Sequence, residues 1–351
     1  MPDFGVVLVG CGTVAGYGHL PAIESHPNTR LVGVADVDPD RAQRACTEYG
    51  AEDWSTDYRD FLGRGDVEVV VITTPPDSHA RIAIDALHAG KNVLCEKPFA
   101  RSLSDAREII RTVRQTGRKL TVGYVLRHNA AYRKAAEMIR DGAVGSPLVM
   151  RLLGSEGYTQ VPKWNRALGL LKNTSPVVDC GCHYADVMRW FTGAEATSVC
   201  GVGGRLNPEV PAAAYDYGSI QVQFDDGSVG TYEVAWGYTF RNFSEKEFIG
   251  PEGRLRIEHI SVEEGKEDIQ QLETYVPGEG LRTIPVEGSI KPMAHQLSSL
   301  IDHITDDLDP LPALADAVKS LEIVLAGHEA ILTGKHVSFP YEGNPIVRSD
   351  L

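Results

Sequence analysis

Three residues have side-chain types and spacing suited to acid–base chemistry, namely Lys97, Asp179 and His183. Asp179 and His183 stand four positions apart, so on a helix both side chains face the same side and the carboxylate can orient the imidazole. Oxidation of a secondary alcohol needs a base for the hydroxyl proton as hydride leaves the carbon, and histidine, with an ordinary pKa of ~6.5, is the usual base. A lysine ammonium beside the same oxygen stabilises the developing alkoxide. The three residues therefore predict such an oxidation, with a helix-capping Asp179 and a satisfied interdomain His183 as the structural alternatives.

Lys97 is expected in an extended segment directly after a buried strand. The predicted strand covers 92–95, and Pro98 disfavours helix at the residue before it. An earlier apolar strand, 67–72, ends in a stiff loop, Thr73–Pro76. Ligands of open α/β sheets bind outside the carboxyl ends of the strands. We therefore expect the loops after both strands to border one site.

The amino-terminal stretch has the pattern of a dinucleotide-binding turn. An apolar strand, 5–9, runs into the sequence GCGTVA (10–15), a G-x-G-x-x-A turn that opens a predicted helix through Ser25. The glycines allow a tight turn and the close approach of a pyrophosphate, and the helix amino terminus offers unpaired N–H groups. A second strand, 31–35, follows as this motif requires.

Asp36 ends that second strand and predicts the choice of cofactor. An acidic side chain at this place can accept hydrogen bonds from the adenosine ribose hydroxyls and repels a 2′-phosphate. Asp36 therefore favours NAD over NADP. The alternative is a helix cap, although Asp38, directly before Pro39, is itself a good cap for the next helix.

His79 lies near the start of the helix predicted after the Thr73–Pro76 loop, with Asp77 or Ser78 as its expected cap. This position allows a contact with the cofactor. A surface histidine is the equal alternative.

The order of the predicted elements divides the chain into two domains. Strands alternating with helices over 1–122 predict a doubly wound Rossmann domain with a parallel sheet of six strands. Residues 123–351 predict an α+β domain with a large open, mixed or antiparallel sheet, since alternating apolar residues run from 198 to 284. We expect 154–174 to be a long polar and aromatic binding loop. One free face of such a sheet favours oligomerisation.

The composition is typical of a folded cytoplasmic protein. The 351 residues carry a formal net charge of −14, which disfavours nucleic acid and anionic membranes as partners. No apolar run approaches the ~20 residues of a membrane span, and we see no signal peptide. The six cysteines lack disulfide spacing, and the run Cys180–His183 lacks the second ligand pair of a structural zinc site, so we expect reduced thiols and no metal.

Over essentially its whole length the chain resembles the glucose–fructose oxidoreductase, inositol dehydrogenase and rhizopine-catabolism (Gfo/Idh/MocA) family. The matching segments are GCGTVA, the long run TPPDSHARIAIDALHAGKNVLCEKP, and DCGCHYADVMRWFTG. The lysine of the family's E-K-P motif matches Lys97, and the aspartate and histidine of its D-x-G-x-H motif match Asp179 and His183. The resemblance implies Lys97 and His183 as the acid–base pair at the substrate hydroxyl, with Asp179 orienting or binding the substrate. It also implies homodimers or homotetramers paired through the open sheets.

Two sets of binding residues follow from the motifs and the resemblance. The expected cofactor-binding residues are Gly10, Gly12, Thr13, Val14, Asp36, Thr73, Thr74, Pro75, His79, Glu96, Lys97 and Arg127. The expected substrate-binding residues are Lys97, Tyr124, Trp164, Asp179 and His183, with Tyr158, Asn165, Tyr238 and His295 as further candidates for the wall of the site.

Departures from the family pattern leave the substrate open. Many members have a run of glycines before the D-x-G-x-H motif, whereas this chain has the sequence NTSP (173–176). After Tyr124 the family's basic residue is matched by Arg127, but the aromatic residue that follows it is not. The expected activity is NAD-dependent oxidation of a secondary hydroxyl of a cyclic polyol or sugar. The alternatives are an NAD-dependent glycosidase acting through a transient keto intermediate, and a non-catalytic regulator that senses NAD or a sugar, against which the retention of all three reactive residues argues.

Overall fold

The computed structural model describes residues 3–157, 161–260 and 269–343. The chain forms two compact units, one of Met1–Val125 with Lys291–Val318 and the other of Leu126–Ile290 with Lys319–Leu351. Each unit is built around its own sheet. Within the described ranges, no helix has the length and apolar character needed to cross a membrane.

The first unit contains a parallel sheet of six strands in the order β3-β2-β1-β4-β5-β6. Its strands are β1 (Phe4–Val9), β2 (Thr29–Ala35), β3 (Asp53–Ser55), β4 (Val69–Ile72), β5 (Asn92–Cys95) and β6 (Leu120–Val122). The strand order reverses between β1 and β4, and open α/β sheets bind ligands at such a switch point. The predicted Rossmann sheet is confirmed; only the short β3 had no clear pattern in the sequence.

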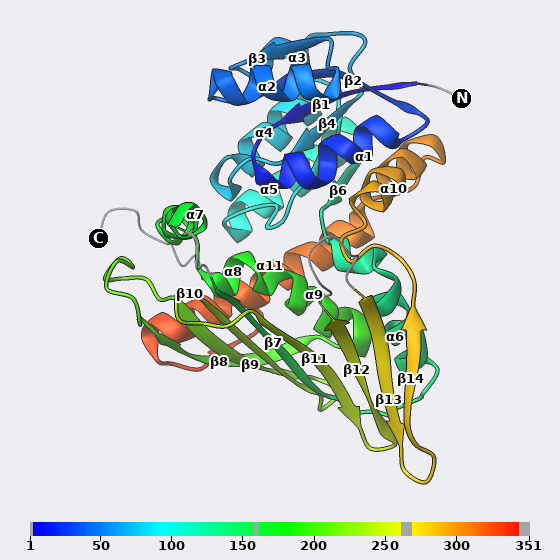
Figure 1. Cartoon of the computed structure of the whole chain (residues 1–351), viewed down its shortest axis with the longest axis vertical. Helices are drawn as coiled ribbons and strands as arrows, with labels where there is room; N and C mark the ends of the chain where they lie inside the picture. The colour runs from blue at the N-terminus through cyan, green and yellow to red at the C-terminus, as the bar shows by residue number, and fades with distance from the viewer. Residues whose placement is uncertain (1–2, 158–160, 261–268, 344–351) are drawn as a thin grey trace. The chain divides into compact units, whose positions relative to one another are not determined.

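Helices cover both faces of this sheet (Figure 1). They are η1 (Ala15–His19), α1 (Leu20–Ser25), α2 (Pro39–Tyr49), α3 (Arg59–Leu62), α4 (Pro76–His88), α5 (Leu103–Thr116) and α10 (Met293–Thr305). Helices α1, α2 and α10 share one apolar cluster with β1, β2 and β4, while α4 packs on β4 and β5 and against α5. The predicted first helix forms through Ser25 and contains a π-helical turn, η1, directly before α1. Pro21, which has no N–H to bond to the preceding turn, follows this change in the helix.

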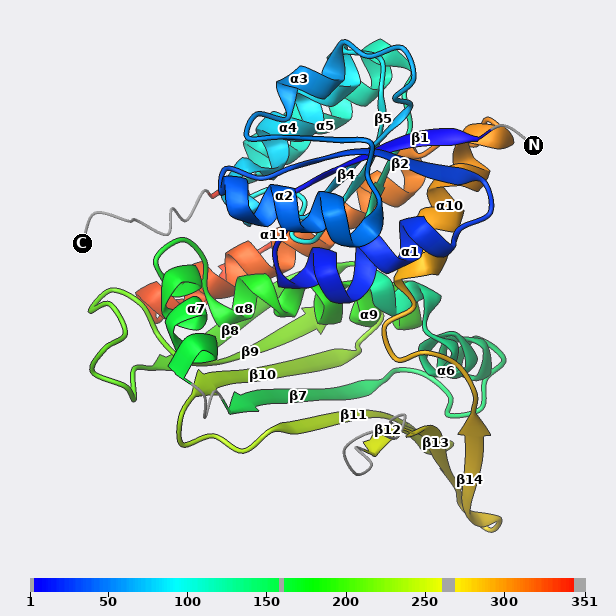
Figure 2. The ribbon, with the colours of Figure 1, turned by 45° about the horizontal axis from the view of Figure 1, so that its top comes forward.

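Helix α10 belongs to the first unit, whereas a division of the sequence at 122/123 groups it with the second domain. Its residues Leu297, Leu300 and Ile301 are buried in the same cluster as Leu8 of β1. Figures 1 and 2 show α10 (orange) beside α1 (blue). The spacing of these residues reveals an apolar helix face. It does not reveal which sheet receives that face.

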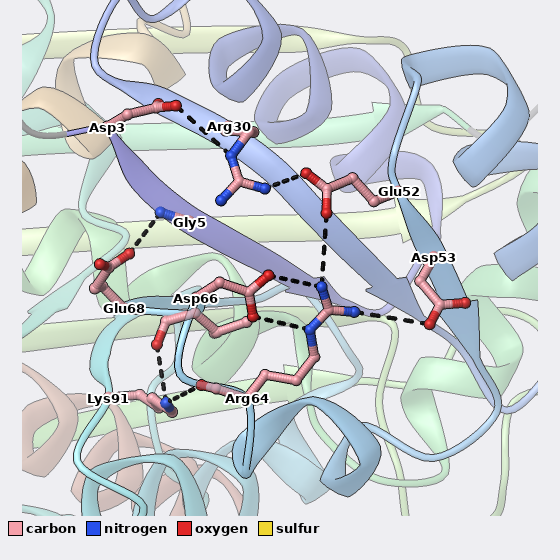
Figure 3. Close-up of polar contacts among 10 residues, drawn as sticks. Asp3, Gly5, Arg30, Glu52, Asp53, Arg64, Asp66, Glu68 and Lys91 are labelled. Atoms are coloured by element: carbon pink, nitrogen blue, oxygen red, sulfur yellow. Dashed lines mark hydrogen bonds and ion pairs between the residues drawn. The ribbon is translucent and has the colours of Figure 1, made fainter.

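Ion pairs stabilise the amino-terminal side of the same sheet. Figure 3 shows Arg64, in the turn before β4, paired with the carboxylates of Glu52, Asp53 and Asp66. Arg64 donates to both oxygens of Asp66, at 3.0 and 2.7 Å, and this holds the pKa of Asp66 at about 2. Lys91 donates to two backbone carbonyls beside them, at 2.7 and 2.9 Å. The charged groups at this edge thus pair with one another, whereas the glycine turn, Asp36 and Lys97 lie at the opposite, carboxyl edge of the sheet.

The second unit contains a mixed sheet of nine strands in the order β14-β13-β12-β11-β7-β10-β9-β8-β15. The strands are β7 (Val149–Gly157), β8 (Ala196–Gly204), β9 (Tyr217–Phe224), β10 (Val229–Gly237), β11 (Phe243–Gly250), β12 (Gly253–Ile260), β13 (Ile269–Val276), β14 (Gly280–Val286) and β15 (Val337–Ser338). Strands β7 and β10 pair in parallel, and the other neighbours are antiparallel. The predicted large mixed sheet is confirmed.

Helices cover one face of this second sheet. The helices are η2 (Val125–His128), α6 (Ala130–Arg140), α7 (Val161–Leu171), α8 (Pro176–Asp179), α9 (Gly181–Thr192) and α11 (Leu311–Thr333), of which α11 crosses the boundary between the units. Helix α6 packs on β12 and β13, α8 on β9 and β10, and α9 on β10. Gly327 of α11 lies directly against Ile220 of β9. Figure 2 shows α8, α9 and α11 along the same side of β8 to β10.

The prediction of a long loop over 154–174 is wrong. Strand β7 continues into it, paired on both sides by β10 and β11, and α7 occupies most of the remainder. Trp164, Ala167 and Leu171 are buried at helical spacing. The exposed Lys163, Asn165 and Arg166 form the polar face of this helix, and such residues are also typical of a loop.

A buried lysine lies beneath α9. Lys246 of β11 is 2% exposed, and its ammonium donates to the Leu153 carbonyl (2.7 Å), the Ser244 hydroxyl (3.0 Å) and the Glu245 carbonyl (3.3 Å). It also lies 4.5 Å from the centre of the Tyr184 ring, a cation–π contact. Burial lowers the pKa of Lys246 to about 7, against the opposite influence of the Glu245 carboxylate. The folded chain therefore gives up this proton at a lower pH than the unfolded chain does.

Lys246→Met is expected to remove a pH dependence of stability. Between pH 7 and the ordinary lysine pKa of ~10.4, the unfolded chain binds a proton that the folded chain does not, so the free energy of unfolding of the wild type rises with pH. The wild-type minus variant difference should grow by on the order of 2 kcal/mol from pH 7 to pH 9, measured by urea unfolding. The exposed Lys335→Met is the control. A difference that does not change with pH would show that Lys246 titrates normally.

Candidate functional site

The turn after β1 is built around Gly10. Its φ is +99°, and a Cβ at this position would lie 2.6 Å from the Thr74 nitrogen, so the site tolerates only glycine. Thr73 fastens the turn to the end of β4, since its hydroxyl donates to the carbonyls of Val9 (3.1 Å) and Gly10 (2.6 Å). The loops after β1 and β4 therefore form one connected surface at the switch point of the sheet.

The turn is open at Gly12. A Cβ at Gly12 would have no heavy atom within 4 Å, so the turn leaves open room where the motif places the phosphates. Thr13 is exposed and Val14 half-buried at the start of η1, where helix N–H groups favour an anion. These residues of the turn would hold the diphosphate of a dinucleotide.

The Asp36 carboxylate, at the end of β2, binds backbone N–H groups and does not cap helix α2. Its two carboxylate oxygens accept hydrogen bonds from the N–H groups of Cys11 (2.7 Å) and Asp38 (2.9 Å). The cap of α2 is Asp38, which accepts from Asp40 and Arg41. Each oxygen of Asp36 keeps a second lone pair, and the carboxylate is only half-buried, so it remains able to accept from ribose hydroxyls.

Lys97 follows β5, and the side chain of the preceding residue, Glu96, is fixed by two contacts. Glu96 is 8% exposed; its Oε1 lies 2.7 Å from Nε2 of His19, and its Oε2 accepts from the Lys97 N–H at 3.1 Å. Lys97 is half-buried, and the Lys97–Pro98 peptide bond is cis. The sequence reasoning did not single out His19. In the sequence, the only indication that His19 could matter is its place in the helix that opens at the dinucleotide turn.

His79 is 1% exposed, so the surface alternative is wrong. Its Nδ1 lies 2.9 Å from the Pro98 carbonyl oxygen, and its Nε2 lies 2.7 Å from the Thr74 carbonyl oxygen. The expected cap by Asp77 or Ser78 is also wrong, because α4 begins at Pro76 without a side-chain cap. His79 therefore lies between the loops after β4 and β5, with both nitrogens against backbone.

In the second unit, Asp179 ends α8 and His183 lies in the first turn of α9. Cys180 between the two helices keeps a right-handed helical conformation, so the i, i+4 relation of the two residues is preserved. Both side chains are half-buried. The side chain of Ser175 caps α8, and α9 has no side-chain cap, so the alternative in which Asp179 caps a helix is wrong.

A buried polar chain supports this capping serine. The Tyr215 hydroxyl donates to Ser175 Oγ (2.9 Å) and lies 2.8 Å from Nδ1 of His328. Burial lowers the pKa of His328 to about 4, so its ring is neutral near pH 7. Ser175 belongs to the NTSP stretch that stands in place of the family's glycines. The substitution thus supplies a helix cap directly before Asp179.

The two cysteines beside Asp179 donate hydrogen bonds to different atoms of that residue. The Cys180 thiol donates to a carboxylate oxygen of Asp179 at 3.7 Å, and the Cys182 thiol donates to the Asp179 carbonyl at 3.2 Å. All six cysteines are free thiols. Among the described residues, no group of three or more His, Cys, Asp or Glu side chains is arranged to hold a metal ion.

Three other residues expected in the site are engaged within their own unit. Arg127 makes a bidentate ion pair with the buried Asp186, at 2.8 and 2.9 Å. The hydroxyl of Tyr124, 6% exposed, donates to the Ala317 carbonyl at 3.5 Å. Trp164 is fully buried and donates its indole N–H to Glu209.

The further candidates for the wall of the site are mixed in exposure. The ring of Tyr238 packs 4.8 Å from that of Trp164 and is 38% exposed, and Asn165 and His295 are exposed. Tyr158 lies outside the described residues.

Comparisons with known proteins agree with this architecture. Residues 4–124 match the family described as "Oxidoreductase family, NAD-binding Rossmann fold", and residues 132–256 match the GFO/IDH/MocA C-terminal domain. A solved structure of scyllo-inositol dehydrogenase from Lactobacillus casei, with bound NAD(H) and scyllo-inositol, has a TM-score of 0.78 at 23% identity and covers 96% of this chain and 99% of that one. That likeness concerns the fold.

Two curated relatives are closer in sequence. The scyllo-inositol 2-dehydrogenase (NAD(+)) of Bacillus subtilis (strain 168) is 29% identical over 265 residues, which are 73% of this chain and 75% of the relative. The inositol 2-dehydrogenase of Rubrobacter xylanophilus is 30% identical over 264 residues, 73% of this chain and 72% of the relative. With both family domains matched in order, the chain belongs to the GFO/IDH/MocA family of oxidoreductases.

Proposed function

We propose that the protein is an NAD-dependent dehydrogenase that oxidises a secondary hydroxyl of a cyclic polyol or sugar. The observation that carries the proposal is the arrangement at the carboxyl edge of the first sheet. There the β4 loop lies against the dinucleotide turn at Gly10, and Lys97 follows the adjacent strand β5. The names of the curated relatives, inositol 2-dehydrogenases, support the polyol class.

The proposal gives each reactive residue one task. When bound, NAD would accept the hydride. Lys97 and His183 are the acid–base pair at the substrate hydroxyl, where an ammonium stabilises the developing alkoxide and an imidazole takes the proton. Asp179 orients His183 or binds the substrate.

The binding residues divide between the two domains. We assign cofactor binding to 1–122 and substrate binding to 123–351, with Arg127 as an additional cofactor contact. Tyr124 is included as a substrate contact, whereas the fully buried Trp164 acts only through the packing of the neighbouring Tyr238. The Asp36 carboxylate supports NAD over NADP, because it can accept from the ribose hydroxyls and repels a 2′-phosphate.

Lys97→Ala is expected to lower kcat by about 10²–10⁴-fold while leaving NAD affinity nearly unchanged, because the substitution removes the proton-transfer group and not the phosphate turn. The measurement is NADH formation on a panel of inositols and pyranoses, with NAD affinity from calorimetry. Lys335→Ala, at an exposed lysine, is the matched control.

Two results would contradict the proposal. Full activity of Lys97→Ala would remove the assigned role of this lysine. Release of a glycosidic leaving group by the wild type without net NADH would replace the dehydrogenase with the glycosidase alternative.

Asp36→Ser is expected to weaken NAD binding about tenfold or more and to improve binding of NADP relative to NAD. A hydrogen bond to a charged group contributes about 1.5–3 kcal/mol, and the repulsion of the 2′-phosphate disappears. Calorimetric titration with both cofactors measures the change. Asp40→Ser, at an exposed acid nearby in α2, should leave the preference unchanged. If Asp36→Ser keeps the wild-type preference, Asp36 has only its backbone contacts.

We also propose that the protein forms homodimers or homotetramers through the face of the nine-stranded sheet opposite the helices. Along that face Arg151, Glu247, Arg254 and Glu273 form a row of ion pairs across four neighbouring strands. A row of alternating charges can pair with a second copy of itself. Arg254→Glu should therefore shift sedimentation toward the monomer, whereas Arg114→Glu, an exposed site on α5, should not. A monomeric wild type would contradict this arrangement.

The compartment is the last part of the proposal. All six cysteines are free thiols, and free thiols are typical of reducing compartments. We therefore propose a cytoplasmic location.

A further inference from the structure

The imidazole of His79 connects two loops at the carboxyl edge of the first sheet. It projects from the first turns of α4, is 1% exposed, and reaches the Thr74 carbonyl with Nε2 (2.7 Å) and the Pro98 carbonyl with Nδ1 (2.9 Å). A carbonyl oxygen can only accept a hydrogen bond. Each ring nitrogen must therefore donate if both contacts are hydrogen bonds.

The charge state of His79 follows from these two contacts. A neutral imidazole carries one N–H, so its second nitrogen would turn a lone pair toward a carbonyl oxygen. Burial is the largest influence and lowers the pKa of His79; the Pro98 and Thr74 carbonyls and the Glu96 carboxylate raise it, and the Lys97 ammonium lowers it. Both distances are within normal hydrogen-bond length, so the two carbonyl contacts favour the doubly protonated ring against the net lowering of its pKa by burial.

The two connected loops are the ones that matter for the proposed chemistry. The Thr74 loop lies directly against Gly10 of the dinucleotide turn. Pro98 is bonded to Lys97. With both ring nitrogens against carbonyl oxygens, the ring has no remaining donor for a cofactor.

We propose that His79 is a positioning residue, which sets the place of Lys97 relative to the dinucleotide turn by binding the carbonyls of both loops. The importance of Lys97 in this inference rests on the proposed function. The connection between the loops is a property of the first unit alone. A displacement of about 1 Å at a reacting group can lower a rate about 10²-fold.

Two conservative substitutions separate the two contacts. The amide nitrogen of Asn is attached to Cγ, as Nδ1 is, so His79→Asn keeps a donor for Pro98 and loses the one for Thr74. The amide nitrogen of Gln is attached one atom further out, as Nε2 is, so His79→Gln keeps a donor for Thr74 and loses the one for Pro98. Neither change leaves a large cavity.

The first measurement is amide hydrogen exchange on the full chain without cofactor. We expect His79→Gln to accelerate exchange over 96–102 by about tenfold and to leave 73–78 near the wild-type rate; His79→Asn should do the reverse. His88→Asn, at an exposed histidine of the same helix, is the control. Equal acceleration of both loops in both variants, or no acceleration, would overturn the inference, because a histidine that only fills space predicts no such selectivity.

The second measurement is kcat with the best substrate of the polyol panel. We expect His79→Gln to lose at least about tenfold more kcat than His79→Asn, with the KM for NAD changed little in both, since only the first releases the Lys97 loop. Equal losses, with the wild type active and Lys97→Ala inactive, would overturn the positioning role and leave the proposed function intact. A wild type inactive on the whole panel would contradict the proposed function, and hydrogen exchange would still decide the inference.

Discussion

The close approach of the β4 loop to the turn after β1 is the constraint on which the first unit's site depends. Any side chain at Gly10 would collide with the backbone of Thr74, 2.6 Å from a Cβ. Because that position is glycine, Thr73 can bond its hydroxyl to the carbonyls at the end of β1. The parallel pairing of β5 with β4 then brings Lys97 to the same edge of the sheet. The absence of a side chain at Gly10 therefore determines how closely the β4 loop can approach the dinucleotide turn.

Polar groups around this edge are held by backbone more than by other side chains. Asp36 accepts from two N–H groups, Glu96 accepts from one, and His79 contacts two carbonyls. Backbone partners leave little freedom to reorient, and hydrogen bonds are stronger in a poorly solvated interior than in water. Such a site is arranged before any ligand arrives, which is what electrostatic stabilisation of a developing charge requires. The second unit uses the same device where Ser175 caps the helix that ends in Asp179.

Local patterns in the sequence predicted most of the first unit and less of the second. The G-x-G-x-x-A turn and the strand before Lys97 lie where the motif and the spacing place them. The region 154–174 was misread, because its polar and aromatic residues, taken without their spacing, have the composition of a loop, whereas they belong to the end of β7 and to α7. His19 was missed altogether, since nothing in its neighbours marks it; its importance lies in a carboxylate 77 residues away.

By itself the sequence determined the fold class, the dinucleotide turn and the motifs that carry Lys97, Asp179 and His183, because each depends on residues close together in the chain. The tertiary structure alone decided that α10 completes the core of the first unit, that His19 holds Glu96, and that His79 is buried between two carbonyls. These are contacts between segments far apart in sequence. The partner of a buried polar group is set by which backbone atoms the fold brings within about 3 Å, and periodicity and spacing carry no record of that distance.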